Sequence, residues 1–238
     1  MKLARRIRAG EPGRAVRSLV LVIVLVALAA PAARAGHHRS KDDGPHRSSR
    51  SCLETLDRLG VKYSRIKRRH IKIGVRVRGP LGGVTYKSWD KRPLILDCSL
   101  AVSLAGAGPM LAAHGIDTAI FSGAYSVRNV AGTHMRSKHT FGLAIDVHVF
   151  EGERSGKLAI KDDYEQGLGD DIDCVGQPLT DKGTVLKTIN CQLRRSELFH
   201  YILDPDYDAH HYNHFHLEAA PWRDRSHASL ERVAAPKG

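Results

Sequence analysis

Two short polar segments of the chain contain the side chains of a possible catalytic metal centre. Residues 137–146 read SKHTFGLAID, and residues 211–216 read HYNHFH. A catalytic zinc ion needs three nitrogen or oxygen donors and one open coordination position, and two imidazoles with one carboxylate meet that need. His139, Asp146 and His216 supply this donor set. The sequence therefore predicts one Zn²⁺ site bound by these three residues.

The first segment is predicted to run into a strand. From Leu143 to Phe150 apolar residues recur at every second position, which is the period of extended backbone. We expect Asp146 to project from one face of this strand. The opposite face, which would pack on the core, carries Leu143, Ile145, Val147 and Val149. Gly142 lets the chain bend before the strand, so that His139 and Asp146 can converge.

The second segment is predicted to be a strand with polar residues on one face. His214, His216 and Glu218 alternate with apolar residues. Side chains two positions apart on one face of a strand lie roughly 7 Å apart, so His214 can stand beside a metal bound by His216. That position suits a base acting on metal-bound water. His211, near the start of the strand, can add a donor or position a substrate.

The pattern Ser-x-His-x-x-Gly-x-Ala-x-Asp followed by His-x-His resembles the zinc peptidase superfamily that includes lysostaphin, D-alanyl-D-alanine carboxypeptidases and hedgehog signalling domains. Within that superfamily the chain looks like the extensin-like C-terminal domain of bacterial envelope proteins, from about Ser51 to Pro221. The resemblance implies that His139, Asp146 and His216 bind zinc. It also implies that His214 is a catalytic residue.

The stretch Tyr125–Arg128 is similar to a family segment in which an Arg lies near the active site. The resemblance implies that Arg128 binds a substrate carboxylate or the developing oxyanion, to which its planar donors are suited. An ordinary surface Arg is the alternative. The chain departs from the family pattern at Val127, Lys138 and Asn213, where Cys, Glu and Asp are common. These departures alter the surroundings of the site and none of its presumed ligands.

Single imidazoles are usually structural or surface residues, and eight of the 14 His of the chain lie between His134 and His216. The residues expected only to flank the site are His134, His148 and His210. A Ser-His-Asp triad built on Ser137 would leave His214 and His216 without a role, and Ser137 is expected to orient the loop instead.

The N-terminal residues 1–35 are typical of a secretory signal. A basic stretch precedes an apolar run of 12 residues and the cleavage pattern Ala33-Arg34-Ala35. An uncleaved anchor is the alternative, but a membrane span needs roughly 20 apolar residues. We therefore expect an exported protein, periplasmic or extracellular, with no stable membrane span after signal removal.

The formal charge of the chain is +12, and residues 1–35 account for +6 of it through seven bases and one acid. The remaining excess is dispersed, apart from the run RIKRRH at residues 65–70. Such a run can contact nucleic acid or an anionic envelope polymer, but it lacks the aromatic residues of a stacking surface. A solvated face is favoured, and no nucleic-acid partner is expected.

Four cysteines in an exported chain favour disulfides. They permit three pairings, of which sequence proximity favours Cys52–Cys98 with Cys174–Cys191. A cysteine-rich zinc site is disfavoured because the sequence has no Cys-x-x-Cys pair.

The predicted organisation is a polar linker at residues 36–50, one domain at residues 51–222 and a tail at residues 223–238. Within the domain the patterns predict a helix over 51–59, a strand over 70–77, a buried helix from the N-cap Asp97 to Ala113, a strand over 117–121, an acidic surface insertion over 151–183 and a helix over 184–203.

These features predict an α+β domain with a small, mainly antiparallel sheet, helices packed on it and a single zinc site on the sheet face. The expected activity, drawn from the resemblance and the compartment, is hydrolysis of amide bonds in peptidoglycan peptides, of carboxypeptidase or endopeptidase type. Zinc would polarise the carbonyl and lower the pKa of bound water towards ~7. The alternatives are a non-catalytic, zinc-stabilised envelope-binding module and a basic binder of envelope polymers.

Overall fold

The computed structural model describes residues 45–168 and 174–222, with side chains from residue 51 onward. The predicted signal at residues 1–35, residues 36–44 of the predicted linker and the predicted tail at residues 223–238 lie outside the described residues. No helix within the described ranges combines the length and the apolar character that crossing a bilayer requires.

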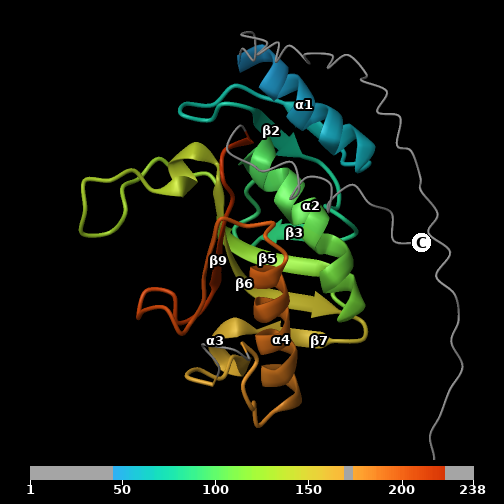
Figure 1. The fold of residues 1–238 in the computed structure, drawn as a ribbon, viewed down its shortest axis with the longest axis vertical. Coiled ribbons are helices and arrows are strands. Elements are labelled where there is room, and N and C mark those ends of the chain that lie inside the picture. The colour runs from blue at the N-terminus through green and yellow to red at the C-terminus, as the bar shows by residue number, and fades with distance from the viewer. Residues whose placement is uncertain (1–44, 169–173, 223–238) are drawn as a thin grey trace, which may run out of the picture. The chain divides into compact units, whose positions relative to one another are not determined.

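The described residues form two β-sheets with helices packed beside them, which confirms the predicted α+β class (Figure 1). The larger sheet has the strand order β3-β5-β6-β9-β8, and β7 also pairs with β6. Only β3 and β5 are parallel, so this sheet is mainly antiparallel, as predicted. Its strands are β3 (Thr85–Ser88), β5 (Thr118–Gly123), β6 (Ala144–Gly152), β7 (Gly156–Ala159), β8 (Tyr201–Leu203) and β9 (Phe215–Glu218).

A smaller antiparallel sheet, with the strand order β1-β2-β4, was not predicted from the sequence. It contains β1 (Tyr63–Arg65), β2 (Gly74–Val77) and β4 (Ile95–Asp97). The strand expected over residues 70–77 is thus limited to its second half. His70 has a left-handed backbone (φ 66°) that interrupts extended structure, and pairing with β4 begins only at Gly74, opposite Asp97.

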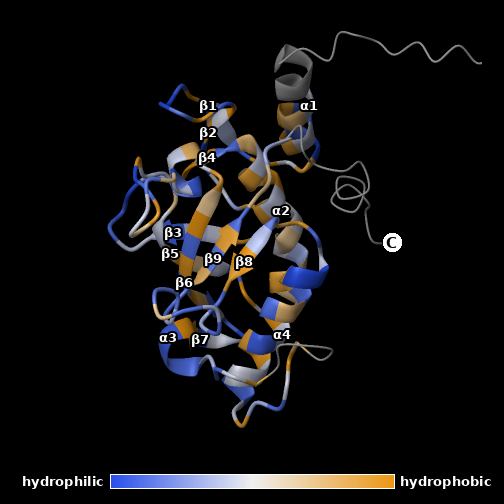
Figure 2. Ribbon diagram, turned by 60° about the vertical axis from the view of Figure 1, so that its left-hand side comes forward, coloured by the Kyte–Doolittle hydropathy of each residue, from blue (hydrophilic) through white to orange (hydrophobic). Residues whose placement is uncertain are grey.

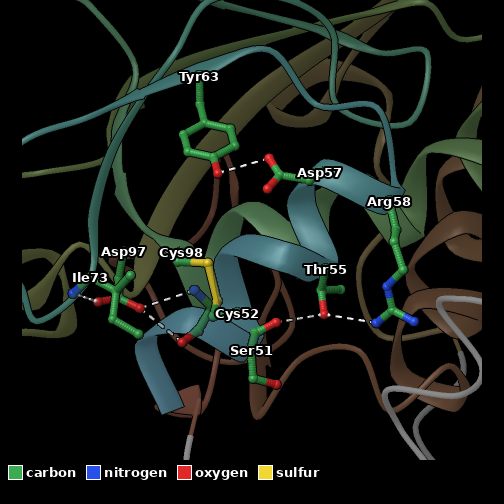
Figure 3. Close-up of a disulfide and its surroundings, with 10 residues drawn as sticks. Ser51, Cys52, Thr55, Asp57, Arg58, Tyr63, Ile73, Asp97 and Cys98 are labelled. Carbon is green, nitrogen blue, oxygen red and sulfur yellow. Dashed lines mark hydrogen bonds between the residues drawn. A yellow bond between two sulfur atoms is a disulfide. The ribbon is translucent and has the colours of Figure 1, made fainter. Parts of the chain in front are cut away.

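Helix α2 (Cys98–Ala113) is the buried helix that the sequence predicted. The Asp97 side chain accepts a hydrogen bond from the Ser99 backbone N–H, which caps the helix as expected. The predicted disulfide Cys52–Cys98 joins α2 to helix α1 (Pro45–Arg58) (Figure 3). Helix α1 begins at Pro45, so the expected start at Ser51 is wrong. The Ser51 carbonyl instead accepts a hydrogen bond from the Thr55 hydroxyl one turn later.

Helices α2 and α4 (Asp181–Arg195) contact each other and lie on the same side of the larger sheet (Figures 1 and 2). Hydrophilic and hydrophobic residues alternate along α4 in Figure 2, and Leu186, Ile189 and Leu193 are its buried apolar members. They join one core cluster with strand residues that alternate along β6 and β9, namely Ile145, Val147, Phe215 and Leu217. The opposite face of β6 and β9 is therefore free to carry polar side chains.

The second half of the chain departs from the predicted elements at two places. The helix expected over residues 184–203 ends at Arg195, and residues 201–203 form β8. Glu197, with φ 55°, lies between the helix and the strand and cannot continue a right-handed helix. The acidic segment 151–183 holds β7 and the short helix α3 (Ile160–Asp163), and its residues 169–173 lie outside the described part. The predicted disulfide Cys174–Cys191 ties this segment to α4.

A bulge in β6 changes which residues of this strand face the core. Ile120 and Phe121, adjacent on β5, pair with Val149 and Val147 on β6, so His148 is an extra residue between them. Val147 is fully buried, but beyond the bulge Phe150 occupies the core and Val149 is only half-buried. The expectation that Val149 faces the core is therefore wrong.

Candidate metal centre

The pairing of β6 with β9 brings two of the predicted ligands together. Asp146 lies directly opposite His216, and Ala144 lies opposite Glu218. Because side chains alternate along strands, these residues project from the face that α2 and α4 do not cover. The His216 Nδ1 atom lies 2.8 Å from the Asp146 Oδ1 atom.

The third predicted ligand, His139, comes from the short 3-10 helix η1 (Lys138–Phe141). Ser137 caps this turn with its side chain, as expected of a loop-orienting residue. Gly142 ends it with a left-handed backbone (φ 66°), and a Cβ atom there would lie 2.7 Å from the Asp97 backbone nitrogen. Only glycine satisfies both conditions, so Gly142 supplies the bend between His139 and β6.

His139, Asp146 and His216 are buried, and one donor atom from each lies within 4.8 Å of the others. The His139 Nδ1 atom lies 2.9 Å from the Ala124 carbonyl oxygen, so Nδ1 must carry the proton and Nε2 a lone pair. Among the described residues, Nε2 has no hydrogen-bond partner, although it is buried 3.2 Å from the Asp146 Oδ1 atom. A lone pair facing a carboxylate oxygen is unfavourable unless a cation lies between them. The donor set therefore fits a bound metal ion.

Gly123 on β5 leaves space beside the carboxylate. A Cβ atom at this position would lie 3.1 Å from the Asp146 Oδ2 atom and 3.8 Å from the His139 Cε1 atom. A larger residue would press on both side chains, so the absence of a side chain at 123 is part of the geometry of the centre.

Charged neighbours set the protonation of these groups. Burial opposes ionisation of Asp146, but the imidazoles of His139 and His216, when they are protonated, outweigh it and lower the pKa of the carboxyl group. Burial also opposes the charged form of His216, but hydrogen bonding to Asp146 and Glu218 raises its pKa to about 9. Lys138, one of the departures from the family pattern, lies with its Nζ atom 2.5 Å from Glu218. Its positive charge thereby offsets the negative charge of Glu218, the second carboxylate of the site.

His214 lies immediately before β9 and faces the same group. Its Nε2 atom is 3.5 Å from the Asp146 Oδ1 atom, and its Nδ1 atom is 2.8 Å from the Asn213 side-chain oxygen. Because that oxygen is an acceptor, Nδ1 carries the proton and Nε2 presents a lone pair towards the site. Burial, assisted by the neighbouring imidazole of His148, lowers the pKa of His214 to about 4. His214 is therefore a neutral acceptor at neutral pH.

Arg128 lies on the long loop between β5 and η1, which extends away from the sheet (Figure 1). One guanidinium nitrogen is 3.5 Å from the Asp146 Oδ2 atom, and half of the side chain is exposed. The Thr140 hydroxyl accepts a hydrogen bond from the Arg128 backbone N–H at 3.0 Å and anchors the loop to η1. Arg128 thus reaches the predicted ligands and still offers donors to solvent.

His211 lies on the other side of His214, with 5.1 Å between the ring centroids. Its Nδ1 atom is 2.7 Å from the Asp208 carboxylate, which holds the ring in place. Its ring centroid lies 5.8 Å from that of His216. The structure therefore gathers all six residues that the sequence analysis assigned to the site.

The family comparison agrees with the motifs that form this centre. Residues 50–228 match the family described as extensin-like protein C-terminus. The chain belongs to this family. Comparisons with curated proteins and with solved structures give no match.

One residue of the extensin-like domain was missed by the sequence analysis. His148 was expected only to flank the site, but its ring lies 5.0 Å from that of His214. Its Nδ1 atom is 3.0 Å from the Asn213 carbonyl oxygen, and its Nε2 atom is 2.8 Å from the Ser122 hydroxyl. Its position two residues after Asp146 on one strand was the signal that could have revealed it. His134 and His210 are exposed and remain flanking residues.

Proposed function

We propose that this extensin-like domain is an exported zinc peptidase that hydrolyses amide bonds in peptidoglycan peptides. The observation that carries the proposal is the buried, unpaired Nε2 lone pair of His139 beside the Asp146 carboxylate and the His216 imidazole. Two imidazoles and one carboxylate are the donor set of many catalytic zinc sites. The two disulfides are compatible with an exported protein.

The substrate class and the place in the lysostaphin, D-alanyl-D-alanine carboxypeptidase and hedgehog superfamily belong to the same proposal. They are supported by the Ser-x-His-x-x-Gly-x-Ala-x-Asp and His-x-His motifs, whose three presumed ligands meet on one sheet face. Zinc, when bound, would polarise a scissile carbonyl and make water a stronger acid.

The residues around the donor set have separate roles. His214 takes a proton from the attacking water, because its neutral Nε2 atom points into the site and Asn213 fixes its orientation. Arg128 binds a substrate carboxylate or the developing oxyanion through its exposed donors. His211, held by Asp208, positions the substrate on the far side of His214.

Other contacts hold the ligands themselves. The Ala124 carbonyl selects the tautomer of His139, and Glu218 lies 3.7 Å from the second ring nitrogen of His216. Such outer partners orient the imidazoles and raise their basicity.

The decisive experiment incubates zinc-loaded mature protein with purified peptidoglycan and identifies the released fragments by mass spectrometry. The His214→Ala protein, loaded with zinc in the same way, is the control. We expect amide-cleaved fragments from the native protein only, with one zinc per chain in both proteins. Absence of stoichiometric zinc, or identical fragments from both proteins, would contradict the proposal.

A further inference from the structure

Five rings form a continuous row across the candidate site, with His214 at its centre. On one side His148 lies 5.0 Å from His214, and Trp89 lies 4.6 Å from His148, measured between ring centroids. On the other side His211 lies 5.1 Å from His214, and Tyr207 lies 5.6 Å from His211. The row thus connects the proposed base to one aromatic side chain at each end.

The two ends of this row are open to solvent. Trp89 is 60% exposed and Tyr207 is 62% exposed, whereas the His214 side chain is 12% exposed. His148, fixed by its two hydrogen bonds, packs against Trp89 and holds the indole beside the site. Large aromatic side chains that are exposed beside a reactive centre are typical of ligand-binding surfaces.

The charges around the two ends differ in sign. Residues 87–92, around Trp89, carry a formal charge of +2. Beside Tyr207, the Asp206 carboxylate is paired with Lys187, and Asp208 leaves a charge of −1. A ligand whose charges are all of one sign would be attracted to one end and repelled by the other. Both rings, however, attract the weakly positive C–H groups on the apolar face of a neutral saturated ring. In peptidoglycan the neutral rings with such C–H faces are the pyranose rings of the glycan strand.

We propose that Trp89 and Tyr207 form two saccharide subsites, one on each side of His214, which hold pyranose rings of the glycan strand next to the peptide being cut. The identity of the strand rests on the proposed function. Binding of sugar at the two rings does not require cleavage, so the two proposals can fail separately.

The test measures binding of three probes to the full mature protein loaded with zinc and carrying His214→Ala, so that no probe is consumed. The probes are an N-acetylglucosamine tetrasaccharide without peptide, a stem tetrapeptide without sugar, and the disaccharide-tetrapeptide. The chain has two tryptophans, and Trp222 is 8% exposed, so a fluorescence change on binding reports mainly on Trp89. Calorimetry gives the affinities of the variants.

We expect the tetrasaccharide to bind and to change the fluorescence. Trp89→Ala and Tyr207→Ala should each weaken tetrasaccharide and disaccharide-tetrapeptide binding roughly fivefold, since a ring contact contributes about 1 kcal/mol. Trp89→Phe should recover part of the loss. Binding of the sugar-free tetrapeptide should not change. Leu179→Ala, which removes another exposed apolar side chain (93% exposed), should affect none of the probes.

The saccharide subsites are overturned if the tetrasaccharide does not bind. They are also overturned if Trp89→Ala and Tyr207→Ala reduce the affinity for the sugar-free tetrapeptide as much as the affinity for the disaccharide-tetrapeptide. If the sugars bind as expected but the native protein cleaves no amide bond, the subsites stand and the peptidase proposal fails. If the native protein cleaves peptidoglycan and the two substitutions leave saccharide binding unchanged, the subsites fail alone.

Discussion

Asp146 on β6 and His216 on β9 are 70 positions apart in the chain, yet they lie directly opposite each other, with 2.8 Å between the carboxylate and the imidazole. Their pairing depends on the register of two central strands. A slip of one residue would turn one of the two side chains into the core beneath the sheet. The geometry of the candidate metal centre therefore depends on the register of β6 and β9.

Zinc binding should release protons and strengthen as the pH rises. The pKa of His216 is raised to about 9, so its ring is protonated at pH 7 and must lose a proton to donate a lone pair. Between pH 6 and pH 8 we expect the affinity to rise by up to about tenfold per unit. Calorimetry in buffers of different ionisation enthalpy would count the released protons. An affinity that does not vary with pH would contradict this assignment of the ligand.

Asn213→Asp should move the acid limb of the activity profile to higher pH. The amide oxygen of Asn213 accepts a hydrogen bond from the His214 ring, whose pKa is about 4. A carboxylate in its place would stabilise the charged imidazole and raise that pKa, so the base would be protonated over a wider acidic range. The rate of peptide cleavage against pH measures the shift. Zinc content should stay the same, and an unchanged acid limb would mean that His214 is not the base.

His214→Ala should reduce turnover by about 10²- to 10⁴-fold, because a positioned base contributes that much to the rate. The ring makes no contribution to the three-residue donor set. The thermal midpoint and the zinc content should therefore change little. Loss of zinc together with activity would show that His214 acts as a ligand instead.

Gly123→Ala should weaken zinc binding. The added Cβ atom would lie 3.1 Å from the Asp146 Oδ2 atom and would push the carboxylate out of its position. Gly79→Ala is the matched control, since its Cβ atom meets nothing closer than 3.5 Å, from the Lys62 side chain. Competition with a chelator would compare the zinc affinities of Gly123→Ala and Gly79→Ala. Equal zinc affinities for both variants would show that the carboxylate has room to move.

Lys187→Met should destabilise the fold by about 3–5 kcal/mol, the cost of removing one charge from a buried ion pair. Lys187 is fully buried, with its Nζ atom 2.7 Å from the Asp206 Oδ2 atom and 4.5 Å from the centroid of the Tyr164 ring. Lys182→Met removes an exposed partner of Asp163 and should cost less than about 1 kcal/mol. Urea unfolding at pH 7 compares the stabilities of the two variants. Similar unfolding midpoints would contradict the expectation that Lys187→Met is the less stable one.

The same buried pair makes stability depend on pH. Burial opposes ionisation of Asp206, but the hydrogen bond from Lys187 outweighs it and lowers the folded-state pKa. The resulting stability is present above the ordinary Asp value of about 3.9 and is lost as the pH falls through the lower folded-state pKa. In urea unfolding, Lys187→Met should lose less free energy of unfolding over this acidic range than the native protein loses. If the free energy of unfolding of the variant falls with decreasing pH as steeply as that of the native protein, the acid sensitivity belongs to other groups.

Local patterns predicted the parts of the fold whose geometry is local. The N-cap at Asp97 and the apolar run behind it predicted α2, and nearby cysteines predicted both disulfides. The end of α4 and the strand β8 were missed, because residues 201–203 become a strand only by pairing with β9. The bulge at His148 was missed for the same reason, since it exists only relative to β5.

The sequence by itself determined which side chains can act as donors and on which strand face they lie, because alternation is a property of the extended backbone. The tertiary structure decided that β6 pairs with β9 in a register that joins Asp146 to His216, and that η1 brings His139 beside them. It also decided that Trp89 and Tyr207 stand at the ends of one row of rings. Such contacts depend on how distant segments bury a common core, and no local spacing contains that information.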